Sequence, residues 1–254
     1  MTKKIASEHY SNAPIIEALI DIQVSMPNDF NREVLEKLAL QLADKFPVKN
    51  EIASFGFTME FQTEGLEQQV APSQSHQVLG FKLNDNENKK ILQLKESGFT
   101  FSLLKPYSDW DSFSEEAKEC WTLFLEYCKP EKVTRCALRY INRIDIPFQT
   151  IEMEKYLNLY PNLPEMKDIP AVIASMQMNL LIPQDELGVA VINQAVVDPY
   201  KNDGFSILLD IDLFKLVSLS PDSENVWGLL SKQRARKNDL FEYFITDKTR
   251  ELIT

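Results

Sequence analysis

The sequence is short of the residues from which many active sites are built. Its 254 residues include only seven glycines, and none of these forms a GxGxxG or GxxxxGK[ST] pattern. Because such glycines let the backbone fold closely around phosphate groups, the two commonest nucleotide-binding loops are excluded. His9 and His76 are the only histidines, and both lie in polar stretches. This scarcity argues against a Ser-His or Cys-His pair for nucleophilic catalysis.

Cysteine is also scarce. Cys120, Cys128 and Cys136 are odd in number and have no CxxC spacing, which is typical of reduced, buried thiols rather than of a disulfide framework. No HExxH or HxH motif and no Cys/His cluster accompanies them, so we expect neither a metal site nor a cofactor.

Long apolar runs and positive charge are missing as well. No apolar run approaches the ~20 residues of a membrane-spanning helix, and no apolar segment follows the lysines of the N-terminal MTKKIASEHY. Without a membrane span or a signal peptide, a cytoplasmic protein is expected. The formal net charge is -11 and the sequence pI is about 4.8. A chain of this charge repels a polyanion, which argues against a nucleic-acid partner.

What the sequence does contain is the pattern of an α+β protein. Alternating apolar residues predict strands, and apolar residues three or four positions apart predict helices. The predicted strands cover residues 15–26, 52–62, 77–83, 90–95, 98–104, 134–147, 176–182, 188–196 and 205–217. The predicted helices cover residues 27–46, 108–129 and 150–160, and a closing helix runs from Ser220 to Ile245.

The order of these elements occurs twice. Each half, 1–130 and 131–254, contains a strand, a helix, several antiparallel strands and a long helix. The two long helices place Trp110 and Phe124 at the same spacing as Trp227 and Phe241. We therefore predict one curved, pseudo-duplicated antiparallel sheet shared by both halves, with helices packed on one face. The alternatives are a chance similarity between two amphipathic helices, and two separately folded domains.

The central strand, residues 134–147, carries the most informative pattern. From Cys136 onward its even-numbered residues are apolar apart from Asn142 and form a core face, while Arg135, Arg139 and Arg143 share the opposite face. If Asn142 is buried, it needs hydrogen-bond partners. The three guanidinium groups must face carboxylates, water or a ligand, because an unpaired buried charge is costly.

The first strand has a similar polar face, with Glu17 and Asp21. The whole arrangement resembles the TATA-box-binding-protein superfamily (TBP-like), in which the first strands of the two halves are neighbours. The resemblance implies that Glu17 and Asp21 lie near Arg139 and Arg143. Two explanations of the arginine row stay open: a ladder of ion pairs with Glu17, Asp21 and Asp145, or a concave surface that holds an anionic partner.

Three stretches of the chain, YSNAPIIEALIDI, RYINRIDIP and KNDLFEYFITDKTRE, resemble a family of uncharacterised prokaryotic proteins described as sporadically distributed. They lie near the start, the middle and the end, so the resemblance spans nearly the whole length. It implies no established activity. A scattered distribution is usual for accessory genes such as those for defence against phage, so the resemblance implies a role of that kind.

These observations favour a non-catalytic binding or regulatory module. We expect Arg135, Arg139, Arg143, Glu17 and Asp21 to contact an anionic small molecule or a partner protein on the open face of the sheet. The alternative is an enzyme that acts on a nucleotide or another phosphorylated small molecule. In that enzyme the arginines would hold the charge and an aspartate would take a proton.

Two further features bear on surfaces and partners. Lys232, Arg234, Arg236 and Lys237 form the only dense basic cluster, a pattern that on a helix usually marks a solvated face. The predicted strand 52–62 lies at a sheet edge and offers unpaired backbone groups to another chain, so we expect a homodimer more readily than a monomer.

Overall fold

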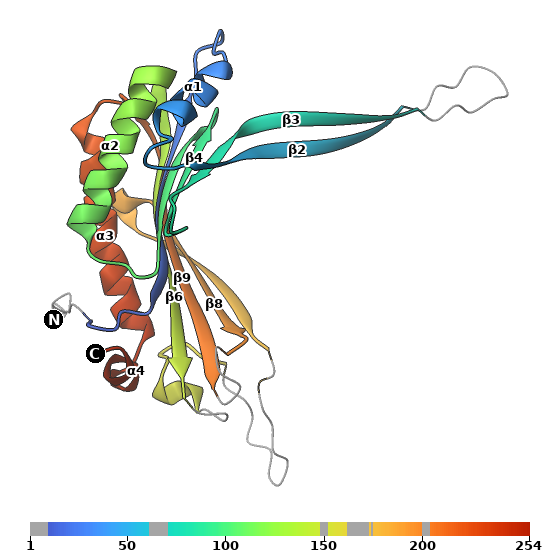
Figure 1. Cartoon of the computed structure of the whole chain (residues 1–254). Coiled ribbons are helices and arrows are strands. Elements are labelled where there is room, and N and C mark those ends of the chain that lie inside the picture. The colour runs from blue at the N-terminus through green and yellow to red at the C-terminus, as the bar shows by residue number, and fades with distance from the viewer. Residues whose placement is uncertain (1–9, 61–70, 148–151, 162–172, 174, 200–203) are drawn as a thin grey trace.

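The computed structural model of the chain describes residues 10–60, 71–147, 152–161, 173, 175–199 and 204–254. For residues 54–60 and 71–76 it describes the backbone alone. The described residues form an α+β fold around one nine-stranded antiparallel sheet (Figure 1). Its strands are β1 (Ile15–Ser25), β2 (Val48–Glu60), β3 (Ala71–Asn84), β4 (Lys90–Lys95), β5 (Gly98–Leu104), β6 (Lys132–Ile146), β7 (Gln177–Pro183), β8 (Val189–Val197) and β9 (Phe205–Leu219).

Two helices, α2 (Trp110–Cys128) and α3 (Glu224–Phe244), begin after residues whose side chains cap them. α2 follows Asp109, whose carboxylate accepts a hydrogen bond from the Ser112 backbone N–H at 2.8 Å. α3 follows Ser223, whose hydroxyl accepts one from the Asn225 N–H at 3.2 Å. Such caps satisfy N–H groups that have no partner within the helix. None of the described helices has both the length and the apolar character needed to cross a membrane. The helices are α1 (Glu33–Gln41), α2 (Trp110–Cys128), α3 (Glu224–Phe244) and α4 (Asp247–Ile253), with 3-10 turns η1 (Met153–Lys155) and η2 (Asp185–Leu187).

The sheet is centred on two strands that are far apart in the sequence. Neighbouring strands follow the order β2-β3-β4-β5-β1-β6-β9-β8-β7. β1 and β6 therefore pair at the centre, with Ile20 opposite Leu138 and Ile22 opposite Cys136. The expected adjacency of the first strand and the central strand is thus observed.

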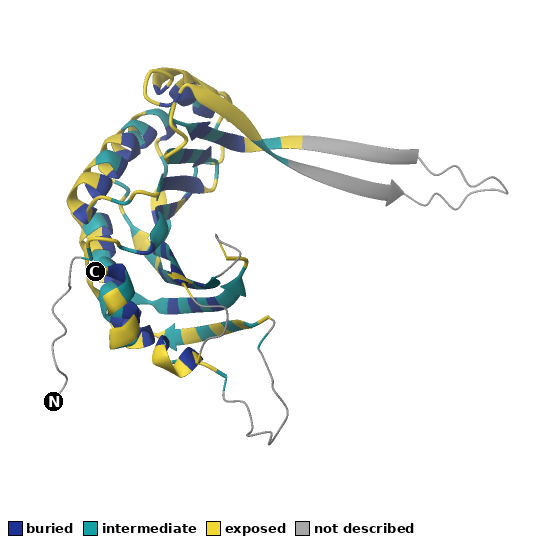
Figure 2. Cartoon of the chain, turned by 60° about the horizontal axis from the view of Figure 1, so that its bottom comes forward, coloured by how far each residue is buried: buried dark blue, intermediate teal, exposed yellow. Residues whose placement is uncertain are grey.

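The two faces of the sheet differ in burial. Ala18, Ile20 and Ile22 of β1 and Leu138 of β6 are fully buried, in a core to which α2 and α3 also contribute. Residues between them in the sequence are more exposed, which gives the strands their alternating colours in Figure 2. Because α2 and α3 lie on the same side of the sheet (Figure 1), we call the other side the open face. Arg139 lies on the open face, because it is next to the buried Leu138 and side chains alternate along a strand.

Most of the predicted strands are confirmed, because alternation along a strand is a local signal. Residues 90–95 and 98–104 have the predicted bounds. The first helix is shorter than predicted and starts at Glu33 rather than near Pro27. Before it the chain makes a turn, in which the Phe30 N–H donates to the Pro27 carbonyl at 3.1 Å.

The predicted helix at residues 150–160 is wrong. Thr150 lies outside the described residues, and in the described part only Met153–Lys155 is helical, as a 3-10 turn. The cause is tertiary, because Leu157 is fully buried and forms a β-bridge with Ile245 at the end of α3. Contacts of this kind override a weak local preference for helix.

One hairpin leaves the body of the sheet. β2 and β3 pair from Val48 opposite Asn84 at the base to Glu60 opposite Ala71 at the far end, and they project away from the other strands (Figure 1). β2 has β3 on one side and no neighbour on the other among the described strands. The predicted edge strand is therefore confirmed over its described part.

Candidate functional site

The arginine row of β6 forms ion pairs within the sheet. Arg135 contacts Asp21 of β1 at 2.6 Å and Asp212 of β9 at 3.5 Å. Its guanidinium lies 4.7 Å from the centre of the Phe214 ring, and Thr100 donates a further hydrogen bond to Asp21 at 2.8 Å. Arg135 thus bridges the strands on both sides of β6.

Arg139 has a partner that the sequence did not predict. Its Nε and Nη2 atoms donate to the two carboxylate oxygens of Asp210 at 2.8 and 2.6 Å, and this pairing raises the pKa of Arg139. Neither Glu17 nor Asp21, the expected partners, pairs with it, because β1 presents Leu19 opposite Arg139. Asp210 lies on β9, on the other side of β6, and is only 5% exposed.

Arg143 pairs along its own strand. Its Nε donates to Asp145 at 2.9 Å, and its Nη2 donates to the backbone carbonyl of Asp198 at 2.6 Å. Asp145 was one of the expected partners. The charge of Glu17 also raises the pKa of Arg139, but its effect is smaller than that of Asp210. All three arginines therefore meet carboxylates of the sheet itself, as in a ladder of ion pairs.

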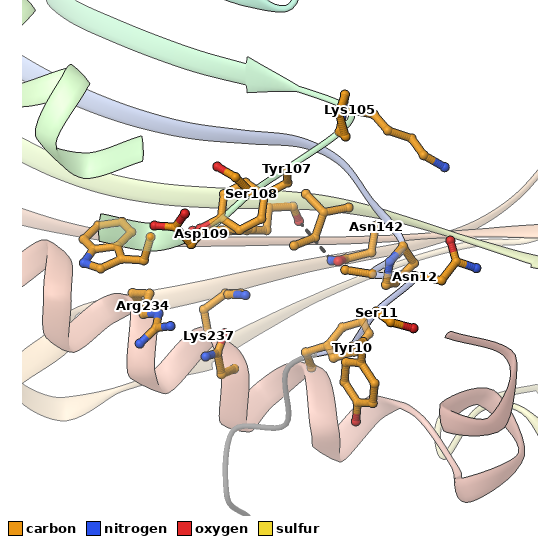
Figure 3. A pocket seen from close by; sticks show the side chains of 18 of the residues that line it. Tyr10, Ser11, Asn12, Lys105, Tyr107, Ser108, Asp109, Asn142, Arg234 and Lys237 are labelled. Carbon is orange, nitrogen blue, oxygen red and sulfur yellow. Dashed lines mark hydrogen bonds between the residues drawn. The ribbon is translucent and has the colours of Figure 1, made fainter. Parts of the chain in front are cut away.

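A cavity of about 290 Å³ lies on the side of β6 that faces α3. Four parts of the chain line this β6–α3 cavity: residues 10–15 before β1, residues 105–110 between β5 and α2, the middle of β6, and one face of α3. In Figure 3, Arg234 and Lys237 lie on α3, across the cavity from the segment that carries Tyr107. The stretches YSNAPIIEALIDI, RYINRIDIP and KNDLFEYFITDKTRE all contribute residues to its walls.

Two tyrosines and a buried asparagine form the wall on the side of the sheet. The hydroxyls of Tyr107 and Tyr140 are 2.9 Å apart, and their rings meet edge to face at 5.5 Å. Burial raises the pKa of Tyr140 well above its ordinary value and also raises that of Tyr107, so both phenols stay protonated at neutral pH. The Asn142 amide donates to the backbone carbonyls of Leu209 at 3.0 Å and Tyr140 at 3.4 Å. The expected need of Asn142 for partners is thus met.

Lys237 is a buried, strongly perturbed titratable group of the cavity. It is only 6% exposed, and its Nζ lies 3.8 Å from the centre of the Tyr140 ring. Burial, followed by the charge of Arg234, lowers its pKa from 10.5 to about 7, against a smaller opposing effect of Glu242. Lys237 is therefore divided between ammonium and free amine at neutral pH. The interpretation of the basic cluster as a solvated helix face is wrong for this residue.

Arg234 is half-buried and lies one turn before Lys237 on α3. The structure describes every arginine of the chain, and Arg234 alone has no ion pair with a described carboxylate. Its positive charge acts on its neighbours, since it lowers the pKa of Lys237 and opposes the rise in the pKa of Tyr107. The cavity therefore contains a cation that the described part of the fold does not pair.

The carboxylates that line the cavity already have partners. Glu242 accepts hydrogen bonds from the Tyr10 hydroxyl at 2.7 Å and from Arg250 Nε at 2.8 Å. Asp109 caps α2 through its hydrogen bond from the Ser112 N–H. An anion that enters the cavity thus meets Arg234 without having to displace a paired carboxylate.

The sequence did contain a signal for the buried position of Lys237. Leu230, Gln233, Lys237 and Leu240 follow one another at three or four residues, and all four are buried. A helical wheel drawn through the apolar members places Lys237 on their face. Charge density alone led to the wrong interpretation.

The cysteines take no part in this site. Cys120, Cys128 and Cys136 are buried and free, and burial raises the pKa of each thiol to about 12. Such thiols are poor nucleophiles and poor metal ligands at neutral pH. Within the described ranges, no group of three or more His, Cys, Asp and Glu residues is placed to hold a metal ion.

Comparison with known proteins assigns no family to the chain. No protein-family model matches it, and a search of the curated proteins finds no match. The candidate functional site therefore follows from geometry and charge, and it is the β6–α3 cavity with Arg234 and Lys237.

Proposed function

We propose that this chain binds a small anionic molecule in the β6–α3 cavity, with Arg234 as the principal contact. The observation that carries the proposal is that Arg234 lines the cavity without a described carboxylate partner, whereas every other arginine has one. A half-buried guanidinium has lost part of its hydration. A carboxylate or phosphate that forms two parallel hydrogen bonds with it replaces the lost water.

The size of the cavity limits the ligand. Its volume of about 290 Å³ is at the lower end of the ~300–1,000 Å³ range of small-molecule sites. A metabolite with one or two anionic groups fits such a space. The phenols of Tyr107 and Tyr140 and the amide of Asn142 offer polar contacts, and Phe241 and Trp110 offer apolar ones.

Binding can be measured by thermal shift and calorimetry with a panel of carboxylic acids, phosphorylated metabolites and nucleotides. Arg234→Gln should weaken the binding of an active compound by at least about tenfold, because a charge-assisted hydrogen bond contributes roughly 1.5–3 kcal/mol. Lys232→Gln is the matched control, since it removes the same charge from an exposed position of α3. Equal loss in both variants, or no loss in Arg234→Gln, would contradict the proposal.

The open face is a second candidate, because Arg139 keeps 39% of its side chain exposed despite its ion pair with Asp210. We propose that Arg135, Arg139 and Arg143 can contact an acidic segment of a partner protein there. Binding to an acidic peptide that Arg139→Gln abolishes and Arg234→Gln leaves intact would support this second site. The reverse pattern would favour the cavity alone.

We also propose that the fold consists of two similar halves, 1–130 and 131–254, as in the TBP-like superfamily. The strand order supports this, since β5, β4 and β3 follow outward from β1 as β9, β8 and β7 follow outward from β6. Each half also has a long helix, α2 or α3. Halves that share one sheet should unfold in a single calorimetric transition, and two independent transitions would contradict the proposal.

The outer edge of β2 supports a further proposal, that two copies of the chain associate. Light scattering at tens of micromolar should then give about twice the 29.3 kDa of the chain. A value equal to one chain would exclude the homodimer.

On the family resemblance alone, we propose that the biological setting is an accessory system such as defence against phage, which plaque assays with the Arg234→Gln variant would test.

A further inference from the structure

Lys237 has a buried amine that simple anion binding does not require. Arg234 supplies a positive charge at every physiological pH, so the cavity needs no second permanent cation to attract an anion. Lys237 is buried beside it and makes no hydrogen bond or ion pair with a described residue; its ammonium lies over the face of the Tyr140 ring. Its amine is therefore not committed to a structural role as a donor.

We infer that Lys237 captures a small carbonyl compound that carries an anionic group, such as a 2-oxo acid, as an imine, while Arg234 holds the anionic group. The inference rests on the proposed function, because it uses the same cavity and the same arginine. It adds the class of ligand and a covalent bond that anion binding alone does not require.

The free amine is the form of lysine that attacks a carbonyl carbon. Burial in the cavity and the charge of Arg234 lower the pKa of Lys237 to about 7, so about half of it is neutral at pH 7. A solvated lysine with a pKa near 10.4 is neutral in well under ~0.1% of molecules at that pH. The Tyr140 ring favours the ammonium form, whereas burial and the charge of Arg234 favour the free amine. The titratable or charged groups around Lys237 are Arg234 and Glu242 on α3, Tyr140 on β6, Lys105, Tyr107 and Asp109 between β5 and α2, and Tyr10 before β1.

The spacing of the two cations suits a short ligand. Arg234 and Lys237 are three residues apart on one helix and both line the cavity, and residues at this spacing have Cβ atoms about 5–6 Å apart on the same face. In a 2-oxo acid the carboxylate and the carbonyl carbon are directly bonded. When Arg234 binds the carboxylate through both of its oxygens, the carbonyl carbon is held on the side of Lys237.

The reaction is balanced without an oxidant or reductant. The amine nitrogen forms a bond to the carbonyl carbon, the carbonyl oxygen takes a proton, and the nitrogen loses one. The resulting carbinolamine releases its hydroxyl as water and leaves a C=N bond, so that one water is produced for each imine. Tyr107 and Tyr140 stay protonated, and their hydroxyls are joined at 2.9 Å. This pair can donate a proton to the departing oxygen and recover one from the nitrogen.

Reductive trapping tests the inference on the full chain. The protein is incubated at pH 7 with pyruvate, glyoxylate or 2-oxoglutarate and sodium cyanoborohydride, and adducts are measured by intact-mass and peptide mass spectrometry. We expect one adduct per chain, located at Lys237, formed at least about tenfold faster than at any exposed lysine because of its larger neutral fraction. Ethyl pyruvate, which lacks the carboxylate, should react at least about tenfold more slowly, because it cannot pair with Arg234.

Variants and the pH profile separate this inference from the proposed function. Lys237→Arg should abolish the adduct, Arg234→Gln should slow it, and Lys232→Arg should leave it unchanged. In the wild-type protein, where no substitution can disturb folding, the trapping rate should increase as pH rises past about 7, because Lys237 loses its proton there. Binding of 2-oxo acids without an adduct at Lys237 would overturn the imine and leave anion binding intact. Labelling spread over exposed lysines would also overturn the imine, and the absence of both binding and adduct would overturn both proposals.

Discussion

The molecule has two cationic regions, the open face and the β6–α3 cavity, and they differ in whether their basic side chains form ion pairs. On the open face, Arg135, Arg139 and Arg143 each find a carboxylate on β1, β9 or their own strand. In the β6–α3 cavity, Arg234 and Lys237 find none at ion-pair distance among the described residues. The register of neighbouring strands places Asp21 and Asp210 diagonally across from Arg135 and Arg139, so complementary charges meet within the sheet. A cavity between four segments has no such register, and its charge stays available to a ligand.

The largest expected effect comes from replacing Lys237 by methionine. The pKa of Lys237 is about 7 in the folded chain and 10.5 in the unfolded one, so the unfolded chain binds more protons between these values. Burial of this lysine therefore costs stability below pH 7, and the cost declines as pH rises toward 10.5. Lys237→Met should raise the free energy of unfolding by roughly 3 kcal/mol at pH 6. This net gain is what remains when ~1–2 kcal/mol for the lost cation–π contact is subtracted from the gain of removing the buried charge.

The difference in unfolding free energy between Lys237→Met and the wild-type protein should fall by about 2–3 kcal/mol between pH 6 and pH 9. Urea unfolding of both proteins across this range measures it. Lys232→Met, at an exposed position of α3, should show no comparable pH dependence. A Lys237→Met difference that stays constant with pH would mean that Lys237 has an ordinary pKa, and the contrast between the two cationic regions would be weaker.

Arg139→Ala should have the next largest effect. It leaves the carboxylate of Asp210 buried without its bidentate partner, and the free energy of unfolding should fall by about 2–3 kcal/mol, less than for a fully buried pair because Arg139 is partly exposed. The double variant Arg139→Ala/Asp210→Asn should recover part of the loss, which a double-mutant cycle measures. A loss below about 0.5 kcal/mol would instead place Arg139 among ligand-binding residues rather than structural ones.

Tyr107→Phe removes one hydroxyl of the tyrosine pair. The Tyr140 hydroxyl then loses its partner at 2.9 Å while it stays buried, so we expect a loss of about 1 kcal/mol in unfolding free energy. Tyr243→Phe, at an exposed tyrosine of α3, is the matched control and should be neutral. Equal stability of both variants would show that the pair is not a structural hydrogen bond.

The smallest expected effect on stability belongs to Arg234→Gln. Because Arg234 forms no described ion pair, its loss should change the free energy of unfolding by less than about 0.5 kcal/mol. Measured beside Arg139→Gln under the same conditions, it compares the two regions directly. A loss as large as that of Arg139→Gln would reveal a structural role for Arg234 and would contradict the account of the cavity.

Local patterns in the sequence predicted most of the fold. The alternation of Ala18, Ile20 and Ile22 marked the core face of β1 correctly, because the side chains of a strand alternate whatever surrounds it. The helix expected at residues 150–160 failed, since Leu157 is held by Ile245 from a distant part of the chain. No local pattern contains such a contact.

The candidate site was harder to predict than the fold. Arg139 pairs with Asp210 because of which strands lie beside β6 and the register in which they pair with it. The cavity depends on the meeting of four segments, and the position of Lys237 among buried residues of α3 was the one local sign of it. Charge patterns thus identified the cations but not which of them are free to bind.

The assembly of the cavity from four segments also determines when it can exist. Its walls come from residues 10–15, residues 105–110, β6 and α3, so a growing chain has made all nine strands of the described sheet before the last wall is synthesised. A chain cut short before α3 lacks both Arg234 and Lys237, the two residues proposed to hold the ligand. Since a ligand stabilises only the species that bind it, it would protect full-length molecules from unfolding and degradation and leave truncated ones exposed to proteases.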